Sequence, residues 1–344
     1  MPLIFFDLSI VVIHLILRPM STKLRLTSKL QQILRIEEFI GLLFMSTSII
    51  LSSILNAYSF QLEILNPGQF FVNSSRIFAS FVFLASFYSG LYLKVWTGRL
   101  QMMRDFAPFL FILVIYFNIQ DVIYLFNPED IHYRLLDWDT FLFGIQPTVW
   151  MEQFYHPRLT DWFALVYLNY YIITLVLLFI LYQRGDVKNF RTIMVTMMIS
   201  YYIGFVCYLF FPASSPYLVI PHYYAFDIWE GTSFISWLTY NLVDLSPHRV
   251  RDAFPSMHNG IVLLTMIMAW RYHRTYFWIQ LPLAASLPIA TIYLRYHYAV
   301  DIIAALPAIG FALVLSPWLE EKWQAYQQHL FSIEDTSQAL ESGS

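Results

Sequence analysis

Long apolar segments recur along almost the whole of this 344-residue chain, separated by short polar turns and by two longer connections. A helix of about 20 apolar residues is long enough to cross the roughly 30 Å hydrocarbon core of a bilayer. The pattern therefore predicts an all-α fold, a polytopic membrane helical bundle. The eight expected spans are residues 39–57, 70–96, 106–126, 161–182, 191–211, 259–273, 276–294 and 299–317.

The two ends of the chain differ from this pattern. Residues 3–18 form a shorter apolar run that contains Asp7 and His14. The run lacks the basic start and small-residue cleavage site of a secretory signal, so it is either a ninth span or an interfacial segment, which gives 8–9 transmembrane helices. Residues 21–38 read as an amphipathic helix whose basic side chains suit lipid headgroups. Residues 319–344 are polar and are predicted to form a loose tail.

Composition supports the membrane class. The mean hydropathy is +0.56, and only 12% of residues are charged, about half the fraction usual for soluble proteins. The single cysteine, Cys207, lies in an apolar segment, so the chain has neither an internal disulfide nor a cysteine-based metal site. The sequence contains no Gly-rich phosphate loop, nucleic-acid module or internal repeat. We therefore expect no cofactor and no nucleic-acid partner.

The distribution of Lys and Arg assigns the two sides of the membrane. Of the 20 basic residues, 14 fall on one side of the predicted topology, which the positive-inside rule makes cytoplasmic. The connections 127–160 and 212–258 and the short link 295–298 then face the other side. The basic side comprises segments 18–35, 94–104 and 184–191 together with Arg271, Arg274 and Lys322.

Two histidine motifs lie at the mouths of apolar segments on the non-cytoplasmic side. Phe-Pro-Ser-Met-His ends at His258, and His297 is followed four residues later by Asp301. Two predicted spans separate the histidines, so both return to the same face of the membrane. The Asp301 carboxylate can fix the tautomer of His297 and leave its other ring nitrogen free to attack phosphorus. His258 can protonate the leaving oxygen.

Further residues of these motifs suit a bound phosphate. Ser256 opens a helix, whose unpaired N–H groups and dipole favour anions. Arg251 and Arg295 flank the two motifs and can clamp phosphate oxygens. Each feature also has a simpler interpretation, because Ser is a common helix cap and Arg a common headgroup anchor. No third strong ligand joins the two histidines and the aspartate at a recognisable spacing, so no metal is predicted.

The two motifs resemble the second and third signature motifs of the type 2 phosphatidic acid phosphatase superfamily. Those motifs usually read Pro-Ser-Gly-His and Ser-Arg, five residues, His, three residues, Asp. The resemblance implies that His297 is the nucleophile and forms a phosphohistidine, that Asp301 orients it, and that His258 protonates the leaving group. It also implies that Ser256 contacts phosphate and that the spans contain a six-helix lipid-phosphatase-like core.

The wider resemblance is to the branch that includes fungal inositol phosphorylceramide synthase, and it covers roughly residues 100–316. Its segments are Arg104–Pro108, Leu136–Trp138 through Phe143–Pro147, and Phe211–Pro216. The predicted domains are a short apolar segment with a basic amphipathic helix (1–38), two extra transmembrane helices (39–100), the catalytic core (101–318) and a polar cytoplasmic tail (319–344).

Two departures from the superfamily pattern concern phosphate binding. The first motif, which reads Lys, six residues, Arg-Pro, is absent, and Tyr208 and Ser215 stand at its charged positions. The third motif has Thr291 where Arg is usual. We expect Arg295 or Arg251 to supply the missing charge.

The sequence predicts a membrane-embedded lipid phosphatase or phosphotransferase that works at the outer leaflet through a phosphohistidine. The expected partners are a lipid phosphate or phospholipid substrate and the surrounding membrane lipids. Two other classes remain open. In a proton-coupled transporter the histidines and the aspartate would form a relay, although the spans are nearly free of charge. A catalytically inactive lipid-binding scaffold would explain the missing Lys and Arg motif.

Overall fold

The computed structural model describes residues 34–230, 232–244 and 251–342. Regular secondary structure in these residues is helical, apart from an isolated β-bridge between Ala213 and Asp252, so the predicted all-α fold is confirmed. The long helices are α3 (Ile36–Gln61), α4 (Pro67–Tyr92), α5 (Arg99–Phe126), α8 (Pro157–Gln183), α9 (Val187–Phe210), α12 (Met257–Tyr272), α13 (Arg274–Tyr293) and α14 (Ala299–Ser342).

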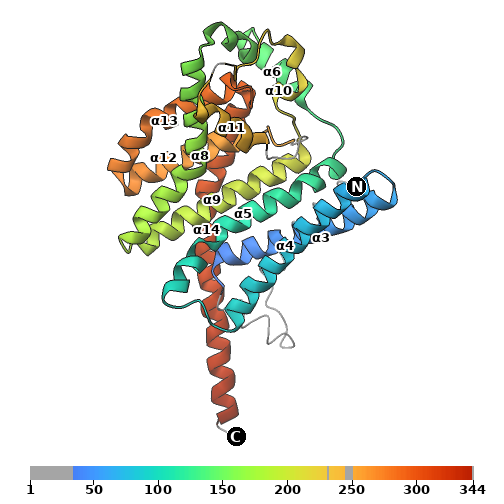
Figure 1. Cartoon of the computed structure of the whole chain (residues 1–344). Coiled ribbons are helices and arrows are strands. Elements are labelled where there is room, and N and C mark those ends of the chain that lie inside the picture. Colours follow the sequence, from blue (N-terminus) through green and yellow to red (C-terminus); the bar gives the residue numbers. More distant parts are fainter. Residues whose placement is uncertain (1–33, 231, 245–250, 343–344) are drawn as a thin grey trace. The chain divides into compact units, whose positions relative to one another are not determined.

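Short helices occupy the two long connections between these elements. Figure 1 shows α6 and α10 gathered at the same end of the helices. The short elements are α6 (His132–Phe143), α7 (Pro147–Trp150), the 3-10 helix η1 (Met151–Phe154), α10 (Pro216–Val219), the 3-10 helix η2 (Pro221–Tyr223) and α11 (Phe234–Asp244). The connections predicted at 127–160 and 212–258 are therefore structured over much of their described residues.

Seven helices in the described part of the chain are long and apolar enough to cross a membrane: α3, α4, Leu100–Gln120 of α5, α8, α9, α13 and Ala299–Leu330 of α14. The polytopic membrane architecture is thus supported. The eighth predicted span, 259–273, corresponds to α12, which has 16 residues. At 1.5 Å per residue this helix is about 24 Å long, shorter than the hydrocarbon core. Residues 3–18 and most of 21–38 lie outside the described residues.

The chain divides into two compact units. The described part of one consists of residues 34–35 and 322–342. There the indole N–H of Trp323 donates to the carbonyl oxygen of Leu34 at 3.1 Å, and the side-chain amide of Gln327 donates to the same oxygen at 2.7 Å. The prediction of a loose tail at 319–344 is wrong, because α14 continues to Ser342. Its Glu, Gln, Ala and Lys residues are good helix formers despite their polarity.

The other unit, Ile36–Glu321, contains the helical bundle. Within it α3 packs against α4, α5 and α9, while α8 packs against α11, α12 and α13, and Figure 1 shows α5 and α9 side by side. Two ion pairs tie the start of α3 to its neighbours, Glu38 with Arg104 of α5 at 2.6 Å and Glu37 with Arg191 of α9 at 3.3 Å. The glutamates are buried, where an unpaired charge would be costly.

Two glycines allow close packing around α12. A Cβ atom at Gly204 of α9 would lie 2.6 Å from Cγ of Met257, and one at Gly260 would lie 3.2 Å from Ile309 of α14. Such short distances mean that the backbone and its neighbouring side chains fit without spare room. The first turn of α12 is therefore held firmly between α9 and α14, and this turn carries His258.

Candidate active site

The helical hairpin α12–α13 brings the two predicted histidines together. A single residue, His273, separates the two helices. His258 lies in the first turn of α12, and His297 lies between α13 and α14. Nδ1 of His258 is 2.9 Å from Nε2 of His297, which is hydrogen-bonding distance. The two intervening helices thus return the chain to the same end of the bundle, as the sequence predicts.

His297 belongs to a turn, residues 294–298, which we call the α13–α14 turn. The carbonyl oxygen of Thr291 accepts from the N–H groups of Tyr296 at 3.0 Å and His297 at 3.2 Å. Arg295 has a φ of 63°, in the left-handed region that non-glycine residues seldom adopt. Asp301 lies in the first turn of α14, and its carboxylate reaches back to accept from the N–H of Tyr298 at 3.0 Å. A tight turn, rather than one helical face, therefore brings Asp301 to His297.

The partners of Nδ1 of His297 fix the protonation of that ring. Nδ1 lies 3.0 Å from the carbonyl oxygen of Ala253 and 3.4 Å from Oδ2 of Asp301. A carbonyl oxygen only accepts hydrogen bonds, so Nδ1 carries the proton and Nε2 has a free lone pair. Asp301 has the predicted position, but the Ala253 carbonyl is the closer acceptor.

The same logic assigns the protons of His258. Nε2 of His297 is an acceptor, so Nδ1 of His258 must be the donor in the 2.9 Å bond between the rings. Nε2 of His258 is then unprotonated, and it accepts from the hydroxyl of Tyr167, 2.9 Å away on α8. Tyr167 is absent from the residues singled out by the sequence, because nothing distinguishes it from the other tyrosines of the same apolar span.

An unusual backbone pairing positions Ala253. Its N–H donates to the carbonyl oxygen of Ala213 at 3.0 Å, and the N–H of Ala213 donates to the carbonyl oxygen of Arg251 at 3.3 Å. Ala213 and Ala253 are both buried in a small apolar cluster with Leu135, Tyr298 and Val300. The Phe-Pro-Ala-Ser-Ser-Pro segment therefore supports the backbone on which His297 rests.

Asp130 anchors the same segment. Its carboxylate accepts from the hydroxyl of Ser214 at 2.5 Å and from the N–H of Ser214 at 3.2 Å. The hydroxyl of Tyr298 donates to the carbonyl oxygen of Ser214 at 2.9 Å. Burial disfavours a charge on Asp130, but hydrogen bonds from Ser214 and His132 outweigh it and lower the pKa of this carboxyl. Asp130 therefore links the segment to the α13–α14 turn in its ionised form.

Asp139 of α6 caps the start of α14. One carboxylate oxygen accepts from the N–H of Ala299 at 3.0 Å and the other from the N–H of Val300 at 2.8 Å. Burial raises the pKa of Asp139, and the two backbone hydrogen bonds oppose that rise. This carboxylate satisfies N–H groups that the helix itself leaves unpaired. Asp139 thus links α6, in the segment 127–160, to α14, the helix that carries Asp301.

Comparison with known proteins matches this site to a family. A family model described as PAP2 superfamily matches residues 134–315, more than half of the chain, including both histidines. The chain belongs to the PAP2 superfamily. A PA-phosphatase related-family protein of Dictyostelium discoideum is 32% identical over 117 residues, which are 33% of this chain and 21% of that protein. The match thus covers about a fifth of that relative. No solved structure matches the chain.

The two arginines predicted to replace the missing phosphate motif of the PAP2 superfamily both bond to other parts of the protein in this structure. Arg295 donates to Glu152 at 2.7 Å and to the carbonyl oxygen of Phe226 at 3.1 Å, and its guanidinium lies 3.8 Å from the ring centroid of Tyr224. Arg251 donates to the carbonyl oxygen of Pro128 at 2.9 Å. Both arginines therefore hold the connections together in this state.

Ser256 and Thr291 occupy the other positions expected to contact phosphate. Ser256 is fully buried at the N-cap of α12, and its hydroxyl accepts from the side-chain amide of Asn259 at 2.9 Å. The same amide donates to the hydroxyl of Thr291 at 3.0 Å. Where many members of the PAP2 superfamily have Arg, this chain thus uses Thr291 to join α13 to the start of α12.

Burial sets the ionisation of His297. It lowers the pKa of this ring to about 4, against the opposing effects of the nearby Asp252 and of the hydrogen bond to Ala253. Asp252 accepts from the hydroxyl of Tyr116 at 2.8 Å, and burial raises the pKa of its carboxyl. At neutral pH the His297 ring is therefore uncharged, with the lone pair on Nε2 that a nucleophile requires.

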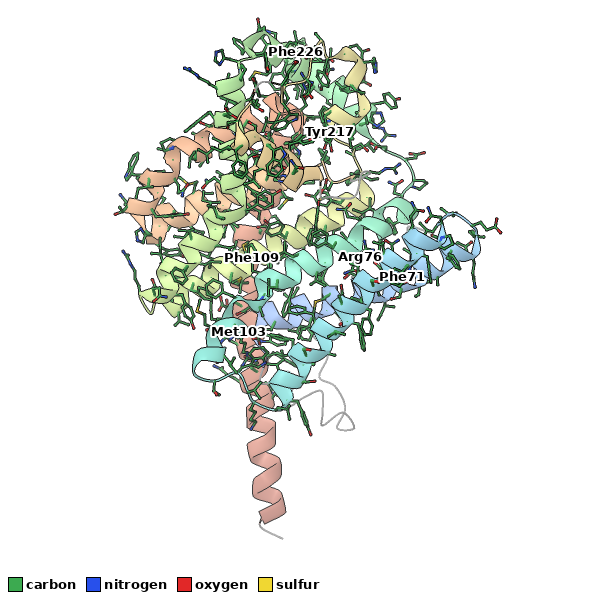
Figure 2. The ribbon with its side chains drawn as sticks, in the orientation of Figure 1. Phe71, Arg76, Met103, Phe109, Tyr217 and Phe226 are labelled. Carbon is green, nitrogen blue, oxygen red and sulfur yellow. The ribbon has the colours of Figure 1, made fainter. Side chains whose placement is uncertain are left out.

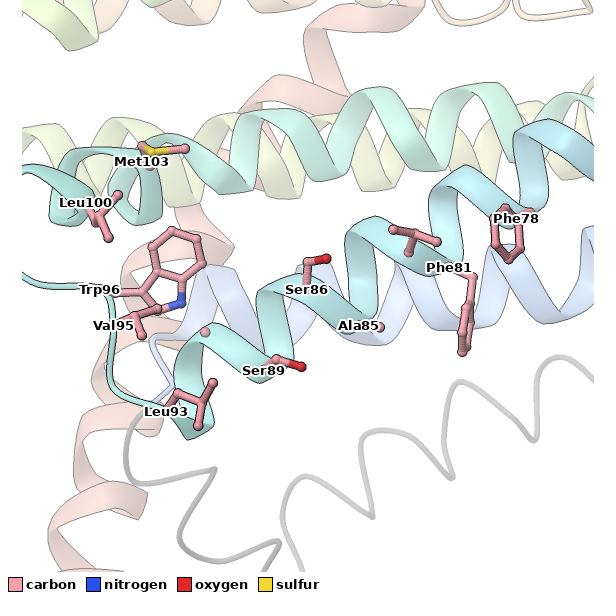
Figure 3. A pocket seen from close by; sticks show the side chains of 12 residues that line it. Phe78, Phe81, Ala85, Ser86, Ser89, Leu93, Val95, Trp96, Leu100 and Met103 are labelled. Carbon is pink, nitrogen blue, oxygen red and sulfur yellow. The ribbon is translucent and has the colours of Figure 1, made fainter.

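Aromatic side chains from the 212–258 connection lie at this end of the bundle. Figure 2 shows Tyr217 and Phe226 there, and the ring of Tyr217 lies 5.6 Å from that of Tyr296 in the α13–α14 turn. A separate cavity of about 620 Å³ runs along α4 and the segment that follows it (Figure 3). Its lining, which includes Phe78, Phe81 and Trp96, contains no titratable side chain, so it is not part of the histidine site.

Replacing Asp139 should test the role of the cap on α14. We expect Asp139→Asn to lower the free energy of unfolding by about 1–3 kcal/mol, because an amide cannot accept from both N–H groups. Thermal unfolding in detergent measures the change. Asp137→Asn, on an exposed side chain of the same helix, is the matched control and should change little. Equal stability of the two variants would contradict a capping role for Asp139.

Proposed function

We propose that this protein is a membrane-embedded lipid phosphatase or phosphotransferase that works through a phosphohistidine on His297. The observation that carries the proposal is the pair of rings joined by a 2.9 Å hydrogen bond. One ring presents a lone pair on Nε2, and the other presents a proton on Nδ1. A nucleophile and an acid–base group directed at the same point are the two components that phosphoryl transfer needs.

The first step of the proposed reaction begins when a phosphate group enters between the rings and separates them. Nε2 of His297 attacks phosphorus, and the bond from phosphorus to the leaving oxygen breaks. A doubly protonated His258, favoured by the negative charge of the bound phosphate, gives its Nδ1 proton to that oxygen. The product alcohol leaves, and the phosphoryl group remains on His297.

The second step returns the enzyme to its starting state. The oxygen of water, or of an acceptor alcohol, attacks phosphorus while its proton passes to Nδ1 of His258. The bond from phosphorus to Nε2 of His297 breaks. Water gives hydrolysis, and an alcohol gives transfer. Throughout both steps the Ala253 carbonyl and Asp301 hold the Nδ1 proton of His297 and stabilise the positive charge that the ring gains.

Charge stabilisation of the phosphoryl group is assigned to the start of α12. The first N–H groups of a helix have no intrahelical partner and favour anions, and Ser256 occupies the N-cap there. Of the two arginines, Arg251 is the better candidate to turn toward phosphate. Its side chain is 18% exposed, whereas that of Arg295 is 9% exposed and forms a 2.7 Å ion pair with Glu152.

The family and the sequence together indicate which substrates to test first. The matched Dictyostelium relative is named as PA-phosphatase related, which favours phosphatidic acid as the first lipid to test. The resemblance to the inositol phosphorylceramide synthase branch favours transfer to a lipid alcohol. The positive-inside pattern of Lys and Arg supports a site on the non-cytoplasmic side.

Replacing the proposed nucleophile tests the function. We expect purified protein in detergent to release phosphate from phosphatidic acid in the presence of EDTA, and His297→Ala to lose on the order of 10³-fold or more of that activity. His222→Ala, an exposed histidine in the 212–258 connection, should keep wild-type activity. If wild type releases no phosphate but forms a phosphorylated alcohol when a lipid alcohol is added, the protein is a transferase. Activity that survives in His297→Ala would contradict the proposal, and inactivity toward monoester and diester lipids alike would favour the scaffold.

The pH profile should report the ionisation of His297. Its pKa of about 4 in the substrate-free protein predicts that kcat/KM falls on the acidic side only below about pH 4, where protonation of Nε2 removes the lone pair. Asp252→Asn removes a negative charge that raises this pKa, so the acidic limb should move to still lower pH. Glu129→Gln, an exposed carboxylate, is the control. An acidic limb near pH 6.5 would show that the titrating histidine is not buried.

A further inference from the structure

Tyr167 contacts the ring nitrogen of His258 that faces away from His297. Its hydroxyl is 2.9 Å from Nε2, and the two rings are stacked with centroids 5.0 Å apart and an interplanar angle of 29°. Tyr167 is only 4% exposed, and the ring of Tyr296 lies against it at 4.8 Å. Packing of the Tyr167 ring between His258 and Tyr296 therefore fixes the position of its hydroxyl. His258 then has a fixed partner on each ring nitrogen, Tyr167 on Nε2 and His297 on Nδ1.

The proposed reaction requires the Tyr167 hydroxyl to donate to Nε2 of His258 in one state and to accept from it in another. In the resting state Nε2 of His258 is unprotonated and the Tyr167 hydroxyl donates to it. When His258 is doubly protonated, Nε2–H becomes a donor and needs an acceptor in a buried site. A hydroxyl satisfies both states by rotating its proton, whereas a backbone N–H or carbonyl satisfies one of them.

We propose that Tyr167 is a positioning residue that keeps the Nδ1 proton of His258 directed at the reaction centre and accepts from Nε2–H when the ring is charged. This inference rests on the proposed function. While Nε2–H is held by Tyr167, only the Nδ1 proton is exchanged with the leaving and attacking oxygens. Loss of the hydroxyl leaves the charged ring with an unsatisfied buried donor, which disfavours the acid form of His258.

Titratable groups from several elements surround His258. Those nearest to it are Tyr167 and Tyr170 of α8 and His297 of the α13–α14 turn. The next groups out are Tyr171 of α8 and Tyr296 beside Tyr167, Tyr201 of α9 beside Tyr170, Asp301 beside His297, and Asp252, which interacts electrostatically with both His297 and Tyr167. Among them Tyr170 provides a matched control. Its ring centroid is 4.4 Å from that of His258, but its hydroxyl is bonded to the hydroxyl of Tyr201 at 2.7 Å.

The test compares Tyr167→Phe with Tyr170→Phe in full-length protein in detergent. For Tyr167→Phe we expect kcat to fall about tenfold to hundredfold, the size of effect expected for a hydrogen bond to a charged group. The basic limb of kcat, set by the acid form of His258, should move to lower pH. The acidic limb of kcat/KM, set by His297, and the value of KM should not move. Tyr170→Phe should keep the wild-type profile, because its hydroxyl does not contact the histidine.

A spectroscopic arm makes the test independent of turnover. In protein labelled with ¹⁵N-histidine, the Nε2 signal of His258, assigned by its loss in His258→Asn, should shift toward that of a free ring nitrogen in Tyr167→Phe but not in Tyr170→Phe. Unchanged Nε2 signal and basic limb in Tyr167→Phe would overturn the proposal. Equal losses of activity and of thermal stability in both variants would overturn it too, since they indicate a packing role. If wild type lacks His297-dependent turnover, the proposed function fails. The ¹⁵N signal then decides by itself whether Tyr167 holds Nε2 of His258.

Discussion

One hydrogen bond, from Nδ1 of His297 to the carbonyl oxygen of Ala253, determines how the whole site is protonated. Because the carbonyl cannot donate, the proton must lie on Nδ1, and each remaining donor along the chain of contacts to His258 and Tyr167 follows from it. The bond depends in turn on the backbone pairing of Ala253 with Ala213. This pairing holds the Ala253 carbonyl next to the α13–α14 turn, which carries His297. A fixed backbone carbonyl, together with the Asp301 carboxylate, therefore orients the proposed nucleophile.

Part of the site could be predicted from the sequence because it depends only on local order along the chain. The apolar pattern between His258 and His297 specifies a helical hairpin, and a hairpin returns both histidines to one end of the bundle. Ala253 and Asp139 could not be predicted, since their roles arise from the folding of two connections that no periodicity describes. Tyr167 carries no sequence signal either, because a tyrosine in an apolar span usually packs or anchors.

The fold was predictable to a similar extent and for related reasons. Hydrophobic length identifies spanning helices well, because the bilayer imposes a fixed thickness. It does not describe polar helices, so the extension of α14 through residues 319–342 was missed, as were the short helices of the connections. The two arginines beside the histidine motifs illustrate another limit. Sequence proximity predicts phosphate contacts for both arginines, but it could not predict their protein partners, which are Glu152 for Arg295 and the carbonyl oxygen of Pro128 for Arg251.

In the proposed reaction His297 carries the phosphoryl group during turnover. The most direct measurement mixes the protein with the lipid phosphate that it turns over, quenches the reaction in alkali, where a phosphorus–nitrogen bond survives, and locates the modification by mass spectrometry. One phosphoryl group is expected on the peptide that contains His297, and none on the corresponding peptide of His297→Ala. Turnover with a phosphoryl group on another residue, or with no phosphorylated peptide at any time point, would contradict it.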